Sequence, residues 1–360
     1  MSINVAVIPG DGIGKEVMAQ GLRVLEGVEE IENVKFKFEE FPWGCEYFLK
    51  NNEMMPSDGL KQLSSFDSIL MGAVGYPGVP DHVSLWGLLL PIRRGFDQYI
   101  NLRPSTLLRG FTSPLANKMP GSFSFDIVRE NTEGEYSNMG GVLREGTEDE
   151  IAVQNSIFTR KGTERVIRYA FNLAMEKSRA SGKVPYVVGA TKSNGINYTM
   201  PFWDRIFRSV ASEFPQVKTN LYHIDALAAY LVTRPESFDV IVGSNLFGDI
   251  LSDIGGAISG GIGVSPSANL NPEGKYPSLF EPVHGSAPDI AGKGIANPVG
   301  MIWTVAMFLE HHNMKQSSRA LIEAIQRASE TGFRTPDLGG KHTTSEVGSK
   351  IIEIFKEISR

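Results

Sequence analysis

Residues 5–14 read Val5-Ala6-Val7-Ile8-Pro9-Gly10-Asp11-Gly12-Ile13-Gly14 and predict a buried strand that turns directly into a helix. The helix is expected over Lys15–Glu30, where the apolar residues recur at helical spacing: Val17, Val24, Leu25 and Val28. The alternation continues along the chain, with short buried strands predicted at 68–73, 186–188 and 240–242 and helices at 165–177, 201–212 and 347–358. Strands that alternate with amphipathic helices predict an α/β fold.

The glycine loop after the first strand stands where a dinucleotide-binding loop would stand. Its spacing departs from G-x-G-x-x-G because the third glycine, Gly14, comes one residue early. No convincing acidic residue follows about 20 residues later, as that fingerprint requires. Two interpretations stay open, a loop that contacts a ligand or a tight turn in which glycine supplies a positive φ.

Length and composition restrict the class of protein. A chain of 360 residues is long enough for two domains, and 41% hydrophobic with 21% charged residues is typical of a globular protein. The net charge of −6 provides no general attraction for nucleic acid. The one cysteine, Cys45, excludes an intrachain disulfide and a cysteine-based zinc site, and it favours a cytoplasmic location. No apolar run approaches the roughly 18 residues of a membrane span, so no membrane partner is expected.

Residues 134–150 form a polar, glycine-punctuated stretch with weak β character. The stretch is either a hairpin arm that projects from the body of the protein or a mobile loop, and the pattern favours neither. A second glycine-rich run, 255–263, would let the backbone approach a ligand or a neighbouring helix closely.

Three arginines offer rigid forks of donors that match carboxylates: Arg93, Arg103 and Arg129. Any one of them alone could be a solvated surface residue. Arg103 and Arg129 each follow apolar residues, and a buried guanidinium needs an anionic partner, which could be a substrate or a structural acid. Tyr136 lies seven residues after Arg129. A tyrosine near cationic groups can act as a proton donor, although a packing role is an alternative.

Two acids, Asp249 and Asp253, are placed to share one face of a helix among apolar neighbours. A hard divalent cation would remove their mutual repulsion, whereas pairing with arginines is the alternative. Asp225, inside another apolar helical pattern, could complete a metal site. Lys192 follows a predicted strand at the end where α/β folds bind ligands, and it could carry a proton or simply be a surface lysine.

Together these stretches resemble the β-decarboxylating dehydrogenase family, which includes isocitrate, 3-isopropylmalate, homoisocitrate and tartrate/D-malate dehydrogenases. The most specific matches are Asn245–Asp253 and Glu281–Ile290, and the similarity runs from Ile8–Gly14 to Thr335–Gly340. The resemblance implies a large mixed sheet flanked by helices in two domains, and it implies no Rossmann fold. It assigns 1–98 plus 261–360 to cofactor binding and 99–260 to substrate, metal and dimerisation, with an arm at about 134–160.

The resemblance also implies a role for each candidate residue. Arg93, Arg103 and Arg129 would hold substrate carboxylates, Tyr136 would protonate the enol, and Lys192 would relay a proton at the hydroxyl. The acids Asp225, Asp249 and Asp253 would bind magnesium or manganese. Lys192 and Asp225 would come from a second subunit, so the active site would be shared within a homodimer. Activation by potassium is a further implication.

The same resemblance places a cofactor loop at His284, Gly285, Ser286, Ala287, Asp289 and Asn297. A carboxylate at Asp289 can accept hydrogen bonds from the adenosine ribose and would repel the 2′-phosphate of NADP. We therefore expect NAD as the cofactor.

Substrate choice depends on the segment before Arg93. Compared with the family, Gly87 and Leu89 stand where isocitrate enzymes need polar groups, and Trp86 stands where isopropylmalate enzymes have a glutamate. An indole that points into the site would fill the space of an isopropyl group, unless Trp86 belongs to the core. Trp86 and Leu89 therefore favour a small 2-hydroxy dicarboxylate, with D-malate oxidised and decarboxylated to pyruvate and tartrate isomers also accepted.

Two alternatives stay open for the function. The first is a 3-isopropylmalate dehydrogenase. The second, more remote, is a non-catalytic regulatory subunit of the same fold, which should have lost a metal acid, Lys192 or Tyr136, whereas this chain has them all.

Overall fold

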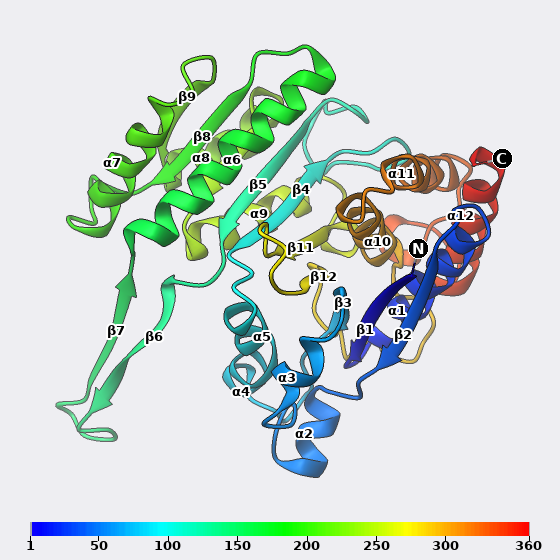
Figure 1. Cartoon of the computed structure of the whole chain (residues 1–360), viewed down its shortest axis with the longest axis horizontal. Helices are drawn as coiled ribbons and strands as arrows, with labels where there is room; N and C mark the ends of the chain where they lie inside the picture. The colour runs from blue at the N-terminus through cyan, green and yellow to red at the C-terminus, as the bar shows by residue number, and fades with distance from the viewer. Residues whose placement is uncertain (1, 360) are drawn as a thin grey trace. The chain divides into compact units, whose positions relative to one another are not determined.

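The computed structural model describes residues 2–359 and divides the chain into two compact units (Figure 1). Unit 1 comprises the residues up to Gln98, Arg103–Phe123 and the residues from Gly255 onward, and unit 2 comprises Tyr99–Leu102 and Ser124–Ile254. The chain passes from one unit to the other within β4 (Ile100–Thr106) and within α9 (Asn245–Ile258). Among residues 2–359, none of the helices combines the length and the apolar character that a bilayer crossing demands.

The sheet of unit 1 has the strand order β2-β1-β3-β12-β11. The strands are β1 (Ser2–Gly10), β2 (Lys35–Glu40), β3 (Ser68–Ala73), β11 (Pro266–Leu270) and β12 (Ser278–Pro282). Neighbouring strands are parallel except β11 and β12, so the sheet is mixed. Every residue of β3 is buried, which explains its continuous apolar sequence, because helices or loops cover both faces of such a strand.

Four helices pack together in unit 1: α1 (Gly14–Glu29), α10 (Val299–His311), α11 (Lys315–Glu330) and α12 (Thr344–Ile358). The predicted apolar face of α1 is fully buried, and α10 is buried almost throughout. A capping box between Thr343 and Glu346 begins α12. The shorter elements are α2 (Cys45–Asn51), α3 (Gly59–Leu63), α4 (Asp81–Ser84), the π-helical turn η1 (Leu85–Leu89), α5 (Leu90–Gly95), η3 (Ile262–Val264) and η4 (Pro336–Leu338).

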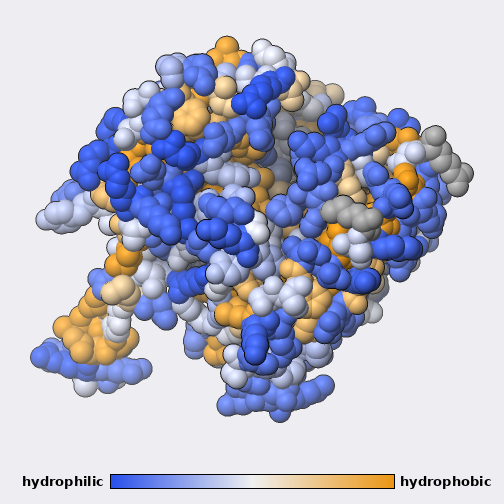
Figure 2. Space-filling model, in the orientation of Figure 1, coloured by the Kyte–Doolittle hydropathy of each residue, from blue (hydrophilic) through white to orange (hydrophobic). Residues whose placement is uncertain are grey.

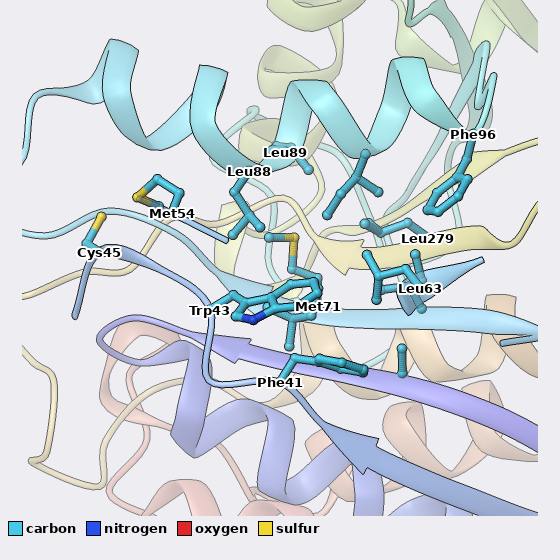
Figure 3. Close-up of a cluster of buried hydrophobic side chains, with 14 of the residues drawn as sticks. Phe41, Trp43, Cys45, Met54, Leu63, Met71, Leu88, Leu89, Phe96 and Leu279 are labelled. Carbon is cyan, nitrogen blue, oxygen red and sulfur yellow. The ribbon is translucent and has the colours of Figure 1, made fainter. Parts of the chain in front are cut away.

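A cluster of buried apolar side chains joins the β strands of unit 1 to its short helices (Figure 3). Its members include Trp43 from the β2–α2 loop, Met71 from β3 and Leu88 from η1. Cys45, fully buried in this cluster, has its pKa raised to about 12 because burial and then the nearby Asp11 carboxylate disfavour the thiolate.

We expect Cys45 to be unreactive toward Ellman's reagent in the folded protein at pH 8, because only the thiolate is nucleophilic. Unfolding in guanidinium chloride should expose one titratable thiol per chain, since the chain has one cysteine. Rapid labelling of the native protein, at the rate seen in denaturant, would contradict this description of the cluster.

Unit 2 contains a parallel sheet in the order β5-β10-β8-β9. Its strands are β5 (Ser124–Glu130), β8 (Tyr186–Thr191), β9 (Lys218–His223) and β10 (Val240–Gly243). The helices are α6 (Arg160–Ser181), α7 (Thr199–Ala211), α8 (Ile224–Thr233) and the first turns of α9, with the 3-10 turn η2 (Pro235–Ser237) before β10. The strands and helices predicted from the sequence in both units are confirmed.

The glycine-punctuated stretch forms a hairpin rather than a loop. Strands β6 (Gly134–Leu143) and β7 (Ile151–Ile157) pair antiparallel and make a two-stranded sheet of their own. The hairpin extends away from the rest of unit 2 (Figure 1). Figure 2 shows apolar side chains along it, and these are about half exposed: Met139 53%, Val142 49%, Leu143 62%, Ile151 48% and Val153 47%.

Candidate active site

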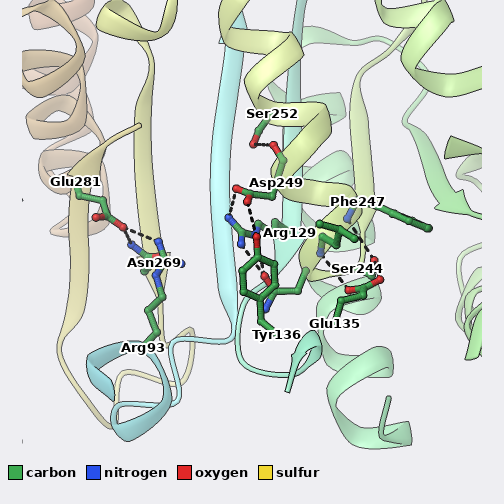
Figure 4. A network of polar contacts seen from close by, with 12 residues as sticks. Arg93, Arg129, Glu135, Tyr136, Ser244, Phe247, Asp249, Ser252, Asn269 and Glu281 are labelled. Carbon is green, nitrogen blue, oxygen red and sulfur yellow. Dashed lines mark hydrogen bonds and ion pairs between the residues drawn. The ribbon is translucent and has the colours of Figure 1, made fainter. Parts of the chain in front are cut away.

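Arg129, Tyr136 and Asp249 come together in unit 2 from three elements (Figure 4). The Arg129 guanidinium donates through Nη1 to Asp249 Oδ1, and Tyr136 donates its hydroxyl hydrogen to Asp249 Oδ2 at 3.1 Å. Nε and Nη2 of Arg129 donate to Asn245 Oδ1 at 3.1 and 2.7 Å. A buried arginine is thus neutralised by an acid that the sequence assigned to metal binding.

Helix α9 approaches Arg129 closely because residue 248 is glycine. A Cβ atom at Gly248 would lie 2.6 Å from Arg129 Cβ, which is far inside van der Waals contact. The helix can therefore present Asp249 to the guanidinium. Asp253, one turn further along α9, is exposed.

Lys192 and Asp225 form a second pair in unit 2. Lys192 Nζ lies 2.8 Å from Asp225 Oδ1, and the Lys192 hydrogen bond lowers the pKa of this carboxyl. Lys192 follows β8 and Asp225 lies in the first turn of α8, so both stand at the carboxyl ends of adjacent parallel strands. The Asp225 side chain is 67% exposed, which leaves it accessible to a further ligand.

The three predicted metal acids are not gathered within one chain. Among residues 2–359 there is no group of three or more histidine, cysteine, aspartate or glutamate side chains that could hold a metal ion. Asp249 and Asp253 lie on one helix, whereas Asp225 lies on α8 with Lys192. The donors that these acids offer are carboxylate oxygens, which are the ligands that magnesium and manganese prefer.

Arg93 is buried in unit 1 and has an acidic partner there. Its Nη2 lies 2.8 Å from Glu281 Oε1, and Asn269 Nδ2 donates to the same oxygen at 2.8 Å (Figure 4). Arg103, on β4, is also buried. The predicted contacts of Arg93 and Arg103 with a substrate stay predictions.

Trp86 lies on the only π-helical turn of the described residues, between α4 and α5. Its ring is half-buried and the Arg94 guanidinium stacks over it at 4.6 Å. Leu89, on the same turn, is buried in the core cluster of Figure 3. Trp86 is not a member of that cluster, and the predicted contacts of Trp86 and Leu89 with a substrate stay predictions.

The predicted cofactor loop packs on the glycine loop of unit 1. Ile13 donates its backbone N–H to the Ser286 carbonyl at 2.9 Å, and a Cβ at Gly12 would lie 2.1 Å from that oxygen. The backbone φ of Gly12 is 54°, so glycine supplies the positive φ of a tight turn here, and contact of this loop with a ligand stays a prediction. Gly12 also lines a cavity of about 400 Å³ with residues of the loops after β3 and β12, among them Gly75 and Pro288.

His284 offers a test of whether this loop fits a dinucleotide. Its Nδ1 lies 3.0 Å from the Gly285 carbonyl, which can only accept, so Nδ1 carries the hydrogen and Nε2 is an acceptor. Burial lowers the pKa of His284, which favours the neutral ring. Nε2 is buried and has no hydrogen-bond partner among the described residues, as expected of a group that receives a donor from a ligand. Asp289 is exposed further along the loop.

The model of the isocitrate/isopropylmalate dehydrogenase family matches residues 4–351. The chain belongs to this family. The resemblance inferred from the motifs is thereby confirmed, and so is the α/β fold class of isopropylmalate-dehydrogenase type.

Relatives within the family are similar over nearly their full length. A probable tartrate dehydrogenase/decarboxylase of Bacillus subtilis is 51% identical over 98% of each chain. A decarboxylating D-malate dehydrogenase of Escherichia coli is 51% identical over 98% of this chain and 99% of the relative. The crystal structure of an isocitrate dehydrogenase from Methylococcus capsulatus superposes with a TM-score of 0.86 at 31% identity, covering 98% of this chain and 99% of that chain.

Four residues of this family member contact predicted site residues or their helix, within one unit or the other, without having been predicted. Glu281 pairs with Arg93, Asn245 bridges Arg129, Glu135 binds the start of α9, and Asp337 accepts a hydrogen bond from Asn297 at 2.9 Å. Each lies inside or beside a motif that the sequence analysis quoted. The apolar residues before Arg129 indicated that it needs an anionic partner, which is Asp249, but no signal in the sequence pointed to these four residues.

Proposed function

We propose that this protein catalyses the NAD-dependent oxidative decarboxylation of D-malate to pyruvate and carbon dioxide, with tartrate isomers also accepted. The cluster of Arg129, Tyr136 and Asp249 carries the proposal. It brings together a guanidinium that can bind a substrate carboxylate, a phenol that can donate a proton, and a carboxylate proposed to bind the metal ion. The names of relatives at 51% identity, a tartrate dehydrogenase/decarboxylase and a D-malate dehydrogenase, support the same substrates.

In the proposed reaction, Arg93, Arg103 and Arg129 hold the two carboxylates of the substrate by bidentate hydrogen bonds. Asp249 and Asp253, with Asp225 of a second copy, would hold a divalent cation, which when bound would supply Lewis-acid stabilisation of negative charge. Lys192, with its neighbour Asp225, takes part in the proton relay at the substrate hydroxyl. Tyr136, whose hydroxyl already donates to Asp249, returns a proton to carbon after carbon dioxide leaves.

NAD is the proposed acceptor of the hydride, bound by the loop from His284 to Asp289 with Asn297. The buried acceptor at His284 Nε2 supports a ligand there, and the exposed carboxylate of Asp289 favours ribose hydroxyls over a 2′-phosphate. We assign residues 1–98 plus 261–360 to cofactor binding and 99–260 to substrate, metal and dimerisation. Activation by potassium stays a prediction.

A homodimer with shared active sites completes the proposal. The half-exposed apolar side chains of the β6–β7 hairpin support it, because a two-stranded ribbon with an uncovered apolar face is marginal in water and gains by pairing with another chain. In the proposed dimer, Lys192 and Asp225 of one copy would lie near Asp249 and Asp253 of the other copy.

The substrate panel tests the proposed function. With Mn²⁺ present, NADH formation should favour D-malate or a tartrate over 3-isopropylmalate and isocitrate by at least roughly 100-fold in kcat/KM, because the indole of Trp86 excludes a bulky group. Trp86→Ala should lower the ratio of kcat/KM for D-malate or a tartrate to kcat/KM for 3-isopropylmalate about 10-fold. Leu85→Ala, on the same π-helical turn and 38% exposed, is the matched control and should leave the preference unchanged. A native preference for 3-isopropylmalate would instead support that dehydrogenase activity.

A further inference from the structure

We infer that Glu135 is a positioning residue, which holds the start of helix α9 in register with Tyr136. The inference rests on the proposed function, because α9 carries the two acids proposed to bind the cation. Glu135 precedes Tyr136 on β6, and its carboxylate binds Ser244 and Leu246, neither of which has an assigned role in the reaction (Figure 4). Its effect on the reaction would therefore be exerted through α9.

Both carboxylate oxygens of Glu135 bind the beginning of α9. Oε1 accepts the hydroxyl hydrogen of Ser244 at 2.8 Å, and Oε2 accepts the backbone N–H of Leu246 at 3.1 Å. The first N–H groups of a helix have no partner within the helix, so an acceptor at this end satisfies one of them. The negative charge is also favourable beside the positive end of the helix dipole.

The contact of Glu135 with Ser244 and Leu246 joins strand β6 to helix α9, in addition to capping the helix. Ser244 stands in the capping position of α9, since its carbonyl accepts the N–H of Gly248 at 2.8 Å. Its hydroxyl oxygen accepts from the backbone N–H of Phe247 at 3.5 Å, at the limit of a hydrogen bond, while its hydroxyl hydrogen is donated to Glu135. Part of the capping of α9 is thus performed by a residue of β6.

Residues on either side of Glu135 in the chain, Glu133 and Tyr136, also contact α9. The Glu133 carbonyl accepts from Asn245 Nδ2 at 2.9 Å, and the Tyr136 hydroxyl donates to Asp249 at 3.1 Å. Gly134 permits the approach, because a Cβ there would lie 3.2 Å from Asn245 Cβ and the backbone φ is 80°. A shift of α9 along β6 would break all these contacts together and would separate Tyr136 from Asp249.

Binding of Mn²⁺ to the dimeric protein, followed by the electron paramagnetic resonance signal of free Mn²⁺, tests the inference without turnover. Glu135→Met removes both acceptors and should weaken Mn²⁺ binding about 10-fold, as for other residues that orient metal ligands. Glu135→Gln should bind Mn²⁺ within about twofold of the native protein, because its oxygen can accept from Leu246 and its amide can donate to the Ser244 hydroxyl. Ser244→Ala, which loses one of the two contacts, should give an intermediate affinity.

The conservative variant separates positioning from charge. Gln and Met both remove the negative charge, so an equal weakening by the two would overturn the inference, and so would native affinity in Glu135→Met. Glu148→Met, an exposed acid in the loop between β6 and β7, is the matched control and should not change the affinity. If Glu135→Met does not fold, Ser244→Ala with native affinity would overturn the inference equally. A native protein that binds no Mn²⁺ would overturn the proposed function itself.

Discussion

Replacement of Asp249 by asparagine is expected to lower metal-dependent NADH formation by about 1,000-fold or more, the scale on which loss of charge stabilisation slows such reactions. The substitution removes one of the carboxylates that would hold the cation. It also removes the charge that faces Arg129 and the oxygen that receives the Tyr136 hydroxyl. Initial rates with D-malate, NAD and Mn²⁺ measure the loss, and EDTA should abolish the activity of the native protein to a similar extent.

A loss of stability must be separated from a loss of metal binding, since Asp249→Asn leaves a buried guanidinium without its anion. That change costs about 1–3 kcal/mol in the free energy of unfolding. Asp126→Asn is a control for loss of an ion pair in the same unit, because Asp126 pairs with Lys177 at 2.5 Å and is largely buried. Lys177 keeps Asp239 at 3.1 Å as a second anionic partner, so the control should lose less stability than Asp249→Asn and keep its turnover. Native turnover in the presence of EDTA would contradict the metal-dependent mechanism.

Two inactive variants are expected to restore one another when mixed. Tyr136→Phe and Lys192→Met should each lower turnover by at least about 100-fold, because each removes a proposed proton carrier. If a site takes Tyr136 from one copy and Lys192 from the other, a hybrid dimer contains one intact site and one doubly defective site. Random exchange of subunits should then return about a quarter of the native activity, given a two-fold symmetric dimer.

Subunit exchange is carried out by mixing the two variants, unfolding them in guanidinium chloride and refolding them by dilution. Tyr136→Phe alone, unfolded and refolded in the same way, is the control for the effect of refolding. Tyr136→Phe mixed with Arg129→Lys is a second control, because both residues lie in one cluster of one unit and should not complement. Full activity in a monomer, or no recovery in the hybrid, would refute the shared site.

Much of the fold follows from local sequence. The strand at Val5–Ile8, the helix after it and the buried β3 are readable because hydrophobic side chains repeat with the period of the element that buries them. The stretch at 134–150 shows where this fails. Its pattern was equally compatible with a loop, and only the pairing of residues 134 and 139–143 with residues on β7 decides for a hairpin.

In the candidate site, too, some features could be predicted from the sequence and others could not. Residue types at Asp249, Arg129 and Tyr136 predict their chemistry, since a carboxylate, a guanidinium and a phenol have the same donors and acceptors wherever they stand. Their partners could not be predicted. Arg129 and Asp249 are brought into contact by the packing of α9 on β5, and Arg93 on α5 meets Glu281 on β12, which is distant in the chain.

By itself, then, the sequence determines the class of fold, the family and the inventory of ionisable groups, because these depend on periodicity and on motifs of neighbouring residues. Tertiary structure alone decides that Asp249 faces Arg129 and Tyr136, that Leu89 is buried in the core while Trp86 stacks with Arg94, and that Glu135 binds the start of α9. The physical reason is that hydrogen bonds and ion pairs form only over a few ångströms. Which groups come that close is set by how whole strands and helices pack.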